Sequence, residues 1–168
     1  AVKEIANLGL KSKVMTFARA VASDIDKAVG CGAWGVLVEV PAGLPRLKYQ
    51  FEWTPEQVLA RSIDTIKYAK SQGLYVVFFP YDGSRAGMEV LQELVGGVCA
   101  KADPDAVAVI DTVGAALPEA VRYLVRQMKA MAGGRPVEIH THNDFGLGVA
   151  GSLAAVAEGA EVVHVSVN

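Results

Sequence analysis

The sequence alternates along its whole length between short apolar runs and longer stretches with helical spacing, and this alternation constrains the fold more than any other feature. Each apolar run is rich in the β-forming residues of a buried strand. Strands and helices that alternate at this spacing form βαβ units with a parallel sheet. The expected strands cover residues 14–17, 35–40, 74–79, 106–110, 137–140 and 162–167, the last one stopping at Asn168.

Helix-start signals separate these strands. Thr54, Pro55 and Gln57 occupy the N-cap, N1 and N3 positions of a capping box, and Ser23 with Asp26 has the same spacing. Glycines then mark the helix ends. The five intervening helices are expected within residues 23–32, 54–73, 88–98, 118–134 and 147–159.

Two α/β architectures accommodate six strands in this order: a flavodoxin-like doubly wound sheet, or about six units of a (β/α)8 TIM barrel. No glycine-rich dinucleotide loop follows the first strands, and the chain ends on a strand without a covering helix. We therefore predict that residues 1–168 form a partial TIM-barrel catalytic domain. Its first strand and last βα unit are expected outside the chain.

Composition excludes several functional classes. The 168 residues have a formal net charge of −2 and no basic cluster, so we expect no nucleic-acid partner. No apolar run approaches the roughly 20 residues of a membrane span, and the N-terminus has no signal-peptide pattern. Cys31 and Cys99 have no C-x-x-C spacing and read as core thiols of a reducing compartment. A cytoplasmic protein is expected.

His140 and His142 are the strongest candidates for a functional site. Residues at i and i+2 of a strand point to the same face, so the two imidazoles are close enough to share one ion. They also lie at the carboxyl end of the predicted strand, where α/β folds place their chemistry. We predict that the pair binds a divalent metal together with a carboxylate ligand; Zn²⁺, Mn²⁺ and Mg²⁺ all remain open.

Polar residues end the neighbouring strands as well. Thr112 follows Asp111, and the pair predicts either a substrate contact from Thr112 or simple turn chemistry. Asp82 is either a turn former or a general acid–base. Glu39 ends an apolar strand, where an acid near a metal or an ordinary salt bridge is equally compatible with the sequence.

Other polar positions have plainer interpretations. His164 and Ser166 give the last strand one polar face, either solvated or turned toward a barrel cavity. Asp144 is expected to cap the helix that follows the histidines. Arg46 and Arg85 lie in loops, where isolated cations are usually solvated.

The string His-Thr-His-Asn-Asp-Phe-Gly-Leu from His140, with the Val-His-Val-Ser-Val-Asn ending at Asn168, resembles the isopropylmalate/homocitrate/citramalate synthase family. That family belongs to the metal-dependent TIM-barrel acyltransferases and lyases that include hydroxymethylglutaryl-CoA lyase. The resemblance covers nearly the whole chain. It includes the Asp-Thr-Val-Gly motif at Asp111 and the segment from Thr54 to Leu74.

The resemblance implies that His140 and His142 hold a divalent metal ion, which chelates an α-keto acid. Acetyl-CoA, or another acyl-CoA, would attack the ketone in a Claisen-type condensation and yield a 2-substituted malate for amino-acid biosynthesis. Thr112 would contact the carboxylate of the keto acid. Relatives of this kind are commonly homodimers, and we expect no membrane partner.

The sequence departs from the family pattern on the strand before Asp82. The family usually has Ser-x-Glu-Asp there, but this chain has Phe79-Pro80-Tyr81-Asp82. Either Asp82 replaces the missing glutamate as the catalytic acid–base, which is our prediction, or the substrate and the proton transfer differ from those of the standard synthases. The family's Arg-Asp-Gly-x-Gln, with a third metal ligand and a catalytic arginine, is expected outside the chain. A carbon–carbon lyase or aldolase and a non-catalytic paralogue are the alternative functions.

Overall fold

A computed structural model describes residues 1–167, and Asn168 lies outside the described residues. Within them, six parallel strands form one sheet in the order β1-β2-β3-β4-β5-β6. This sequential order is that of a barrel wall, whereas a flavodoxin-like sheet places its first strand between later ones. The predicted TIM-barrel segment is therefore confirmed. The strands are β1 (Met15–Arg19), β2 (Gly35–Pro41), β3 (Tyr75–Tyr81), β4 (Ala106–Asp111), β5 (Val137–Thr141) and β6 (Val162–Val163).

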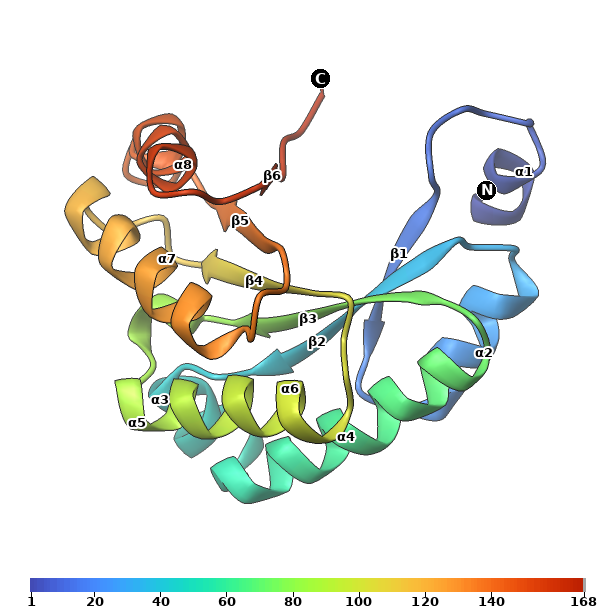
Figure 1. Cartoon of the computed structure of the whole chain (residues 1–168), viewed down its shortest axis with the longest axis horizontal. Coiled ribbons are helices and arrows are strands. Elements are labelled where there is room, and N and C mark those ends of the chain that lie inside the picture. Colours follow the sequence, from blue (N-terminus) through green and yellow to red (C-terminus); the bar gives the residue numbers. More distant parts are fainter. Residues whose placement is uncertain (168) are drawn as a thin grey trace.

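The main helices lie along the outside of the curved sheet, and α1 lies apart from them (Figure 1). Among residues 1–167, no helix is both long and apolar enough to cross a membrane. The helices are α1 (Val2–Ala6), α2 (Ala22–Gly30), α3 (Leu44–Arg46), η1 (Leu47–Phe51), α4 (Pro55–Ser71), η2 (Gly83–Arg85), α5 (Met88–Leu91), η3 (Gln92–Gly96), α6 (Gly97–Lys101), α7 (Pro118–Met131) and α8 (Gly148–Ala157).

One of the two predicted capping boxes forms. Thr54 Oγ1 accepts a hydrogen bond from the backbone N–H of Gln57 (3.4 Å), and Gln57 Oε1 accepts one from the backbone N–H of Thr54 (3.0 Å). The capping box predicted at Ser23 is wrong, because α2 begins after Val21, which makes no side-chain cap. Asp24, in the first turn of α2, instead accepts a hydrogen bond from Arg19 Nε (2.7 Å).

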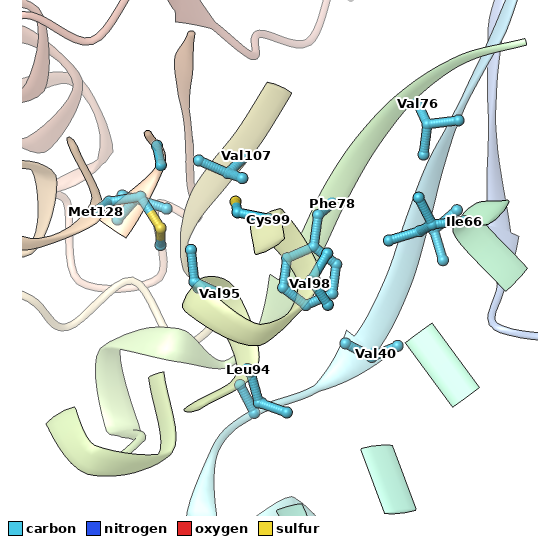
Figure 2. Close-up of a cluster of buried hydrophobic side chains, with 14 of the residues drawn as sticks. Val40, Ile66, Val76, Phe78, Leu94, Val95, Val98, Cys99, Val107 and Met128 are labelled. Carbon is cyan, nitrogen blue, oxygen red and sulfur yellow. The ribbon is translucent and has the colours of Figure 1, made fainter. Parts of the chain in front are cut away.

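The sheet is apolar on both faces, as expected for the wall of a barrel. Side chains on its outer face pack against the helices and form the larger core. Fully burying one of them, such as Phe78, contributes about 2 kcal/mol. A second cluster, centred on Val77 and Ile110, fills the inner face. Figure 2 shows part of the outer core, including Val40, Ile66, Val76, Phe78, Leu94, Val95, Val98, Cys99, Val107 and Met128.

Two predicted segments differ from the structure. The loop expected after Pro41 contains helical turns, α3 and η1, and Pro41 itself continues β2 opposite Tyr81. Proline is tolerated there because β1 pairs with β2 only as far as Glu39, so the missing N–H of Pro41 removes no hydrogen bond from the sheet. The last strand is shorter than predicted: only Val162 and Val163 pair with β5. Within the described residues, β6 has a neighbour on one side alone, which limits its ladder.

Candidate active site

The carboxyl ends of the strands surround a cavity of about 500 Å³ on the inner face of the sheet. In α/β barrels this end of the strands carries the active site. The polar side chains that line the cavity are Glu39, Arg46, Tyr81, Thr112, His140 and His142. Three of the four predicted site residues therefore meet in one cavity, and Asp82 does not line it.

His140 and His142 lie at the end of β5 with their ring centroids 5.2 Å apart. The backbone N–H of His142 donates to the carbonyl of Asp111 (3.1 Å), which extends the pairing with β4 beyond the end of the strand. Burial lowers the pKa of His140 to about 4, with further lowering from His164 and His142. His140 is therefore neutral at pH 7, and one ring nitrogen has a free lone pair.

The segment after β5 is anchored to the start of α8. Thr141 Oγ1 donates to the carbonyl of Gly148 (3.0 Å), and Asn143 Oδ1 accepts a hydrogen bond from the N–H of Gly148 (3.0 Å). Asn143, rather than the expected Asp144, thus accepts the hydrogen bond of the first N–H group of α8. The turn that Gly146 closes by donating to the carbonyl of Asn143 (3.0 Å) brings the asparagine amide back onto α8.

His164 and Glu138 extend the histidine pair into the barrel interior. His140 Nδ1 lies 3.2 Å from His164 Nδ1, and His164 Nε2 lies 2.7 Å from Glu138 Oε2. His164 and Ser166, which follow β6, line a second hollow of about 630 Å³ that His140 and His142 also border. Glu138 was missed as a site residue, although its spacing from His140 places both on one face of β5. The sequence signal that could have identified Glu138 is a single acidic residue inside an otherwise apolar strand.

Thr112 is placed to donate a hydrogen bond into the cavity. Its Oγ1 accepts a hydrogen bond from the backbone N–H of Asp82 (2.8 Å). Because that bond occupies a lone pair and leaves the hydroxyl hydrogen free, Thr112 has a donor available for a ligand. This geometry suits the predicted contact with a carboxylate.

The Asp82 carboxylate is fully buried between two arginines. Arg85 donates two hydrogen bonds to it, from Nε and Nη2, each 2.7 Å long. Arg46 Nε lies 3.9 Å from Asp82 Oδ2 and has no hydrogen-bond partner among the residues that the structure describes. Asp82 has a left-handed backbone (φ 61°), and a Cβ at Gly43 would overlap its carboxylate. The two arginines expected in solvent therefore both lie against Asp82.

Tyr81 occupies the cavity wall at the position of the expected family glutamate. Burial, followed by the negative charge of Glu39, raises the pKa of Tyr81 to about 12. The guanidinium carbon of Arg46 lies 6.0 Å from the ring centroid of Tyr81. At neutral pH the side chain is a protonated phenol, which donates or accepts a hydrogen bond but carries no charge.

The six parallel strands and the cavity at their carboxyl ends define a segment of an α/β barrel. The family model described as HMGL-like matches residues 1–168, and the chain belongs to this family. The solved structure of hydroxymethylglutaryl-CoA lyase from Pseudomonas aeruginosa superposes on 98% of the chain with a TM-score of 0.80. It is 18% identical in sequence, and the match covers 57% of that structure's chain, so the likeness concerns the fold.

Curated relatives carry synthase names. The chain is 42% identical to the probable 2-isopropylmalate synthase of Ignicoccus hospitalis and 38% identical to the homocitrate synthase AksA of Methanopyrus kandleri. Both matches cover 100% of the chain but 42% of the relative. The chain thus spans less than half the length of these relatives.

Proposed function

We propose that the chain forms part of the active site of a metal-dependent synthase that condenses an acyl-CoA with an α-keto acid. The observation that carries the proposal is the placement of His140 and His142 beside Thr112 in one cavity at the strand ends. The synthase names of relatives that match the entire chain support the same reaction class.

The donor chemistry of the histidine pair fits a divalent cation. His140 is held neutral, and neutral imidazoles are common ligands of Zn²⁺ and Mn²⁺. Among residues 1–167, no group of three His, Cys, Asp or Glu side chains is arranged to hold a metal ion. We therefore expect His140 and His142 to provide two ligands, with a carboxylate from elsewhere in the full-length protein. When bound, the cation supplies Lewis acidity at the ketone of the keto acid.

The reaction balances as a condensation followed by hydrolysis. The acyl-CoA loses a proton from its α-carbon, which bonds to the keto carbon, and the ketone oxygen becomes a hydroxyl. Water then cleaves the thioester to a carboxylate and free CoA. Thr112 orients the keto acid by donating its free hydroxyl hydrogen to the substrate carboxylate. Tyr81 offers a neutral hydrogen-bonding group in the same cavity.

The acid–base role of Asp82 stays a prediction. Its contacts also support a positioning role, because its backbone N–H fixes the Thr112 hydroxyl and its carboxylate lies against Arg46 and Arg85.

The test measures CoA release by the metal-free full-length protein. It is incubated with acetyl-CoA and a panel of α-keto acids, with and without Mn²⁺, and free thiol is titrated. We expect release that requires both the keto acid and the cation. Thr112→Val should raise the KM for the keto acid about 30-fold, because a hydrogen bond to a charged group contributes about 2 kcal/mol. Thr16→Val is the matched control, because Thr16 lies in β1 on the face of the sheet that points away from the cavity, and it should leave the KM unchanged.

The outcomes separate the alternatives. Cleavage of a 3-hydroxyacyl-CoA without condensation would replace the synthase by the lyase. Absence of cation binding and of CoA release with every keto acid would leave the non-catalytic function. An unchanged KM in Thr112→Val would remove Thr112 from the substrate site.

A further inference from the structure

Three side chains form a continuous hydrogen-bonded chain on the inner face of β5 and the residues after β6. The chain runs from Glu138 through His164 to His140, with 2.7 Å between Glu138 Oε2 and His164 Nε2 and 3.2 Å between the two Nδ1 atoms. Glu138 and His164 are largely buried, with 7% and 18% of their side chains exposed. His142 has no equivalent partner among the hydrogen bonds of the described residues.

The positions of the protons follow from the carboxylate. An ionised carboxylate only accepts hydrogen bonds, so His164 must carry a proton on Nε2. When His164 carries this one proton alone, its Nδ1 has a lone pair, which accepts from Nδ1–H of His140 at 3.2 Å. His140 is consequently protonated on Nδ1, and its Nε2 has the free lone pair. If His164 instead carried its proton on Nδ1 alone, the lone pair on its Nε2 would face the carboxylate of Glu138 at 2.7 Å.

We propose that Glu138, acting through His164, fixes His140 in the Nδ1-protonated tautomer and so presents Nε2 to a divalent cation. The inference rests on the proposed function, in which His140 is a metal ligand. A second group that orients a ligating imidazole through its other nitrogen is a general device of metal sites. Here the carboxylate of Glu138 does not contact His140 directly, because the imidazole of His164 lies between them and is hydrogen-bonded to both.

Packing against Phe79 fixes the orientation of the imidazole rings of His140 and His164. The Phe79 ring stacks on His164 at an interplanar angle of 4° and meets His140 edge-on at 77°. The centroid separations are 6.1 Å to His164 and 5.3 Å to His140. Rotation of either imidazole would break both this packing and a hydrogen bond, so Glu138 and His164 are positioning residues for His140.

Glu138→Gln tests the proposal with almost no change of shape. A glutamine offers His164 a donor as well as an acceptor, so His164 is free to reverse its protons and His140 to carry its proton on Nε2. We expect the affinity of the full-length protein for Mn²⁺ or Zn²⁺, measured calorimetrically, to fall about 10-fold to 100-fold. Glu161→Gln, an exposed substitution just before β6, should leave the affinity unchanged.

Nitrogen-15 NMR of labelled histidine in the metal-free protein reads the tautomers directly. We expect a protonated Nδ1 for His140 and a protonated Nε2 for His164, and a mixture of tautomers in Glu138→Gln. His164→Leu should lose metal affinity, and His164→Gln should recover part of it, because an amide can both donate to Glu138 and accept from His140. A merely space-filling role predicts no such recovery.

The two proposals fail in different ways. A lone pair on His140 Nδ1 in the wild-type protein would overturn the tautomer assignment, whether or not a cation binds. An affinity unchanged by Glu138→Gln would show that the chain does not prepare His140. If the wild-type protein shows the predicted tautomers but binds no cation, the tautomer assignment stands. The role of His140 as a metal ligand is then wrong, and so is the proposed function.

Discussion

Gly114→Ala tests how the structure links the Asp-Thr-Val-Gly motif to the metal-ligand candidates. Gly114 has φ +69°, and a Cβ added there would lie 2.7 Å from the carbonyl oxygen and 2.9 Å from the carbonyl carbon of His142. Both are backbone atoms, so no flexible side chain can relieve the overlap. Gly146 is the matched control, because its φ is +74° and a Cβ there meets nothing within 4 Å.

The two variants separate conformational strain from the steric clash. A left-handed alanine costs about 1–2 kcal/mol, partly offset by the lower entropy of the unfolded chain. Gly146→Ala should therefore lower the free energy of unfolding by about 1 kcal/mol. Gly114→Ala adds the cost of overpacking, about 1–3 kcal/mol, for a total near 3 kcal/mol. With a urea m-value of about 2 kcal/mol/M, the two unfolding midpoints should differ by about 1 M.

Urea unfolding of the metal-free full-length protein, followed by circular dichroism, measures this difference. Divalent-cation affinity of the folded variants should fall in Gly114→Ala, because His142 is displaced, and should hold in Gly146→Ala. Equal midpoints and equal affinities for the two variants would refute the close contact between Gly114 and the His142 backbone.

Two further predictions concern ionisable side chains near the cavity. Arg85→Met should lower the free energy of unfolding by about 2 kcal/mol, less than for a fully buried pair because Arg85 is 42% exposed. Adding Asp82→Asn should restore part of this loss, because the buried carboxylate would otherwise keep only its longer contact to Arg46 at 3.9 Å. Additive losses in the double variant would contradict this coupling. Tyr81 should ionise near pH 12, seen as the absorbance difference between wild type and Tyr81→Phe in an alkaline titration. The pKa of Tyr81 in the folded protein exceeds the ordinary value near 10. The contribution of Tyr81 to the free energy of unfolding is therefore complete below pH 10 and falls as the pH rises toward 12. Ionisation of Tyr81 near pH 10 would refute its burial.

The fold was largely predictable because the central strands β2, β3 and β4 are buried on both faces and therefore read as continuous apolar runs. Thr54 and Gln57 were predictable as a cap because the capping box is a local pattern. Ser23 shows the limit of that reasoning: its spacing was correct, but Arg19 at the end of β1 and Asp24 fix the entry into α2 through contacts that the pattern does not contain. The short β6 likewise depends on which strands flank it.

The candidate site was predictable where side chains share a strand. His140 and His142 meet because alternate residues face the same side, and Thr112 joins them because neighbouring strands end together. Contacts between elements distant in sequence were not predictable. Arg46 reaches Asp82 from α3, after β2, and His164 reaches Glu138 from the segment that follows β6.

Carbon–carbon bond formation is the central claim, and isotope labelling tests it most directly. The full-length protein is given acetyl-CoA labelled with carbon-13 in the methyl group, an α-keto acid and Mn²⁺, and the products are followed by carbon NMR. The account predicts a labelled methylene bonded to a quaternary carbon that bears a hydroxyl, formed in step with free CoA. Labelled acetate alone, or unchanged acetyl-CoA with every keto acid tried, would contradict it.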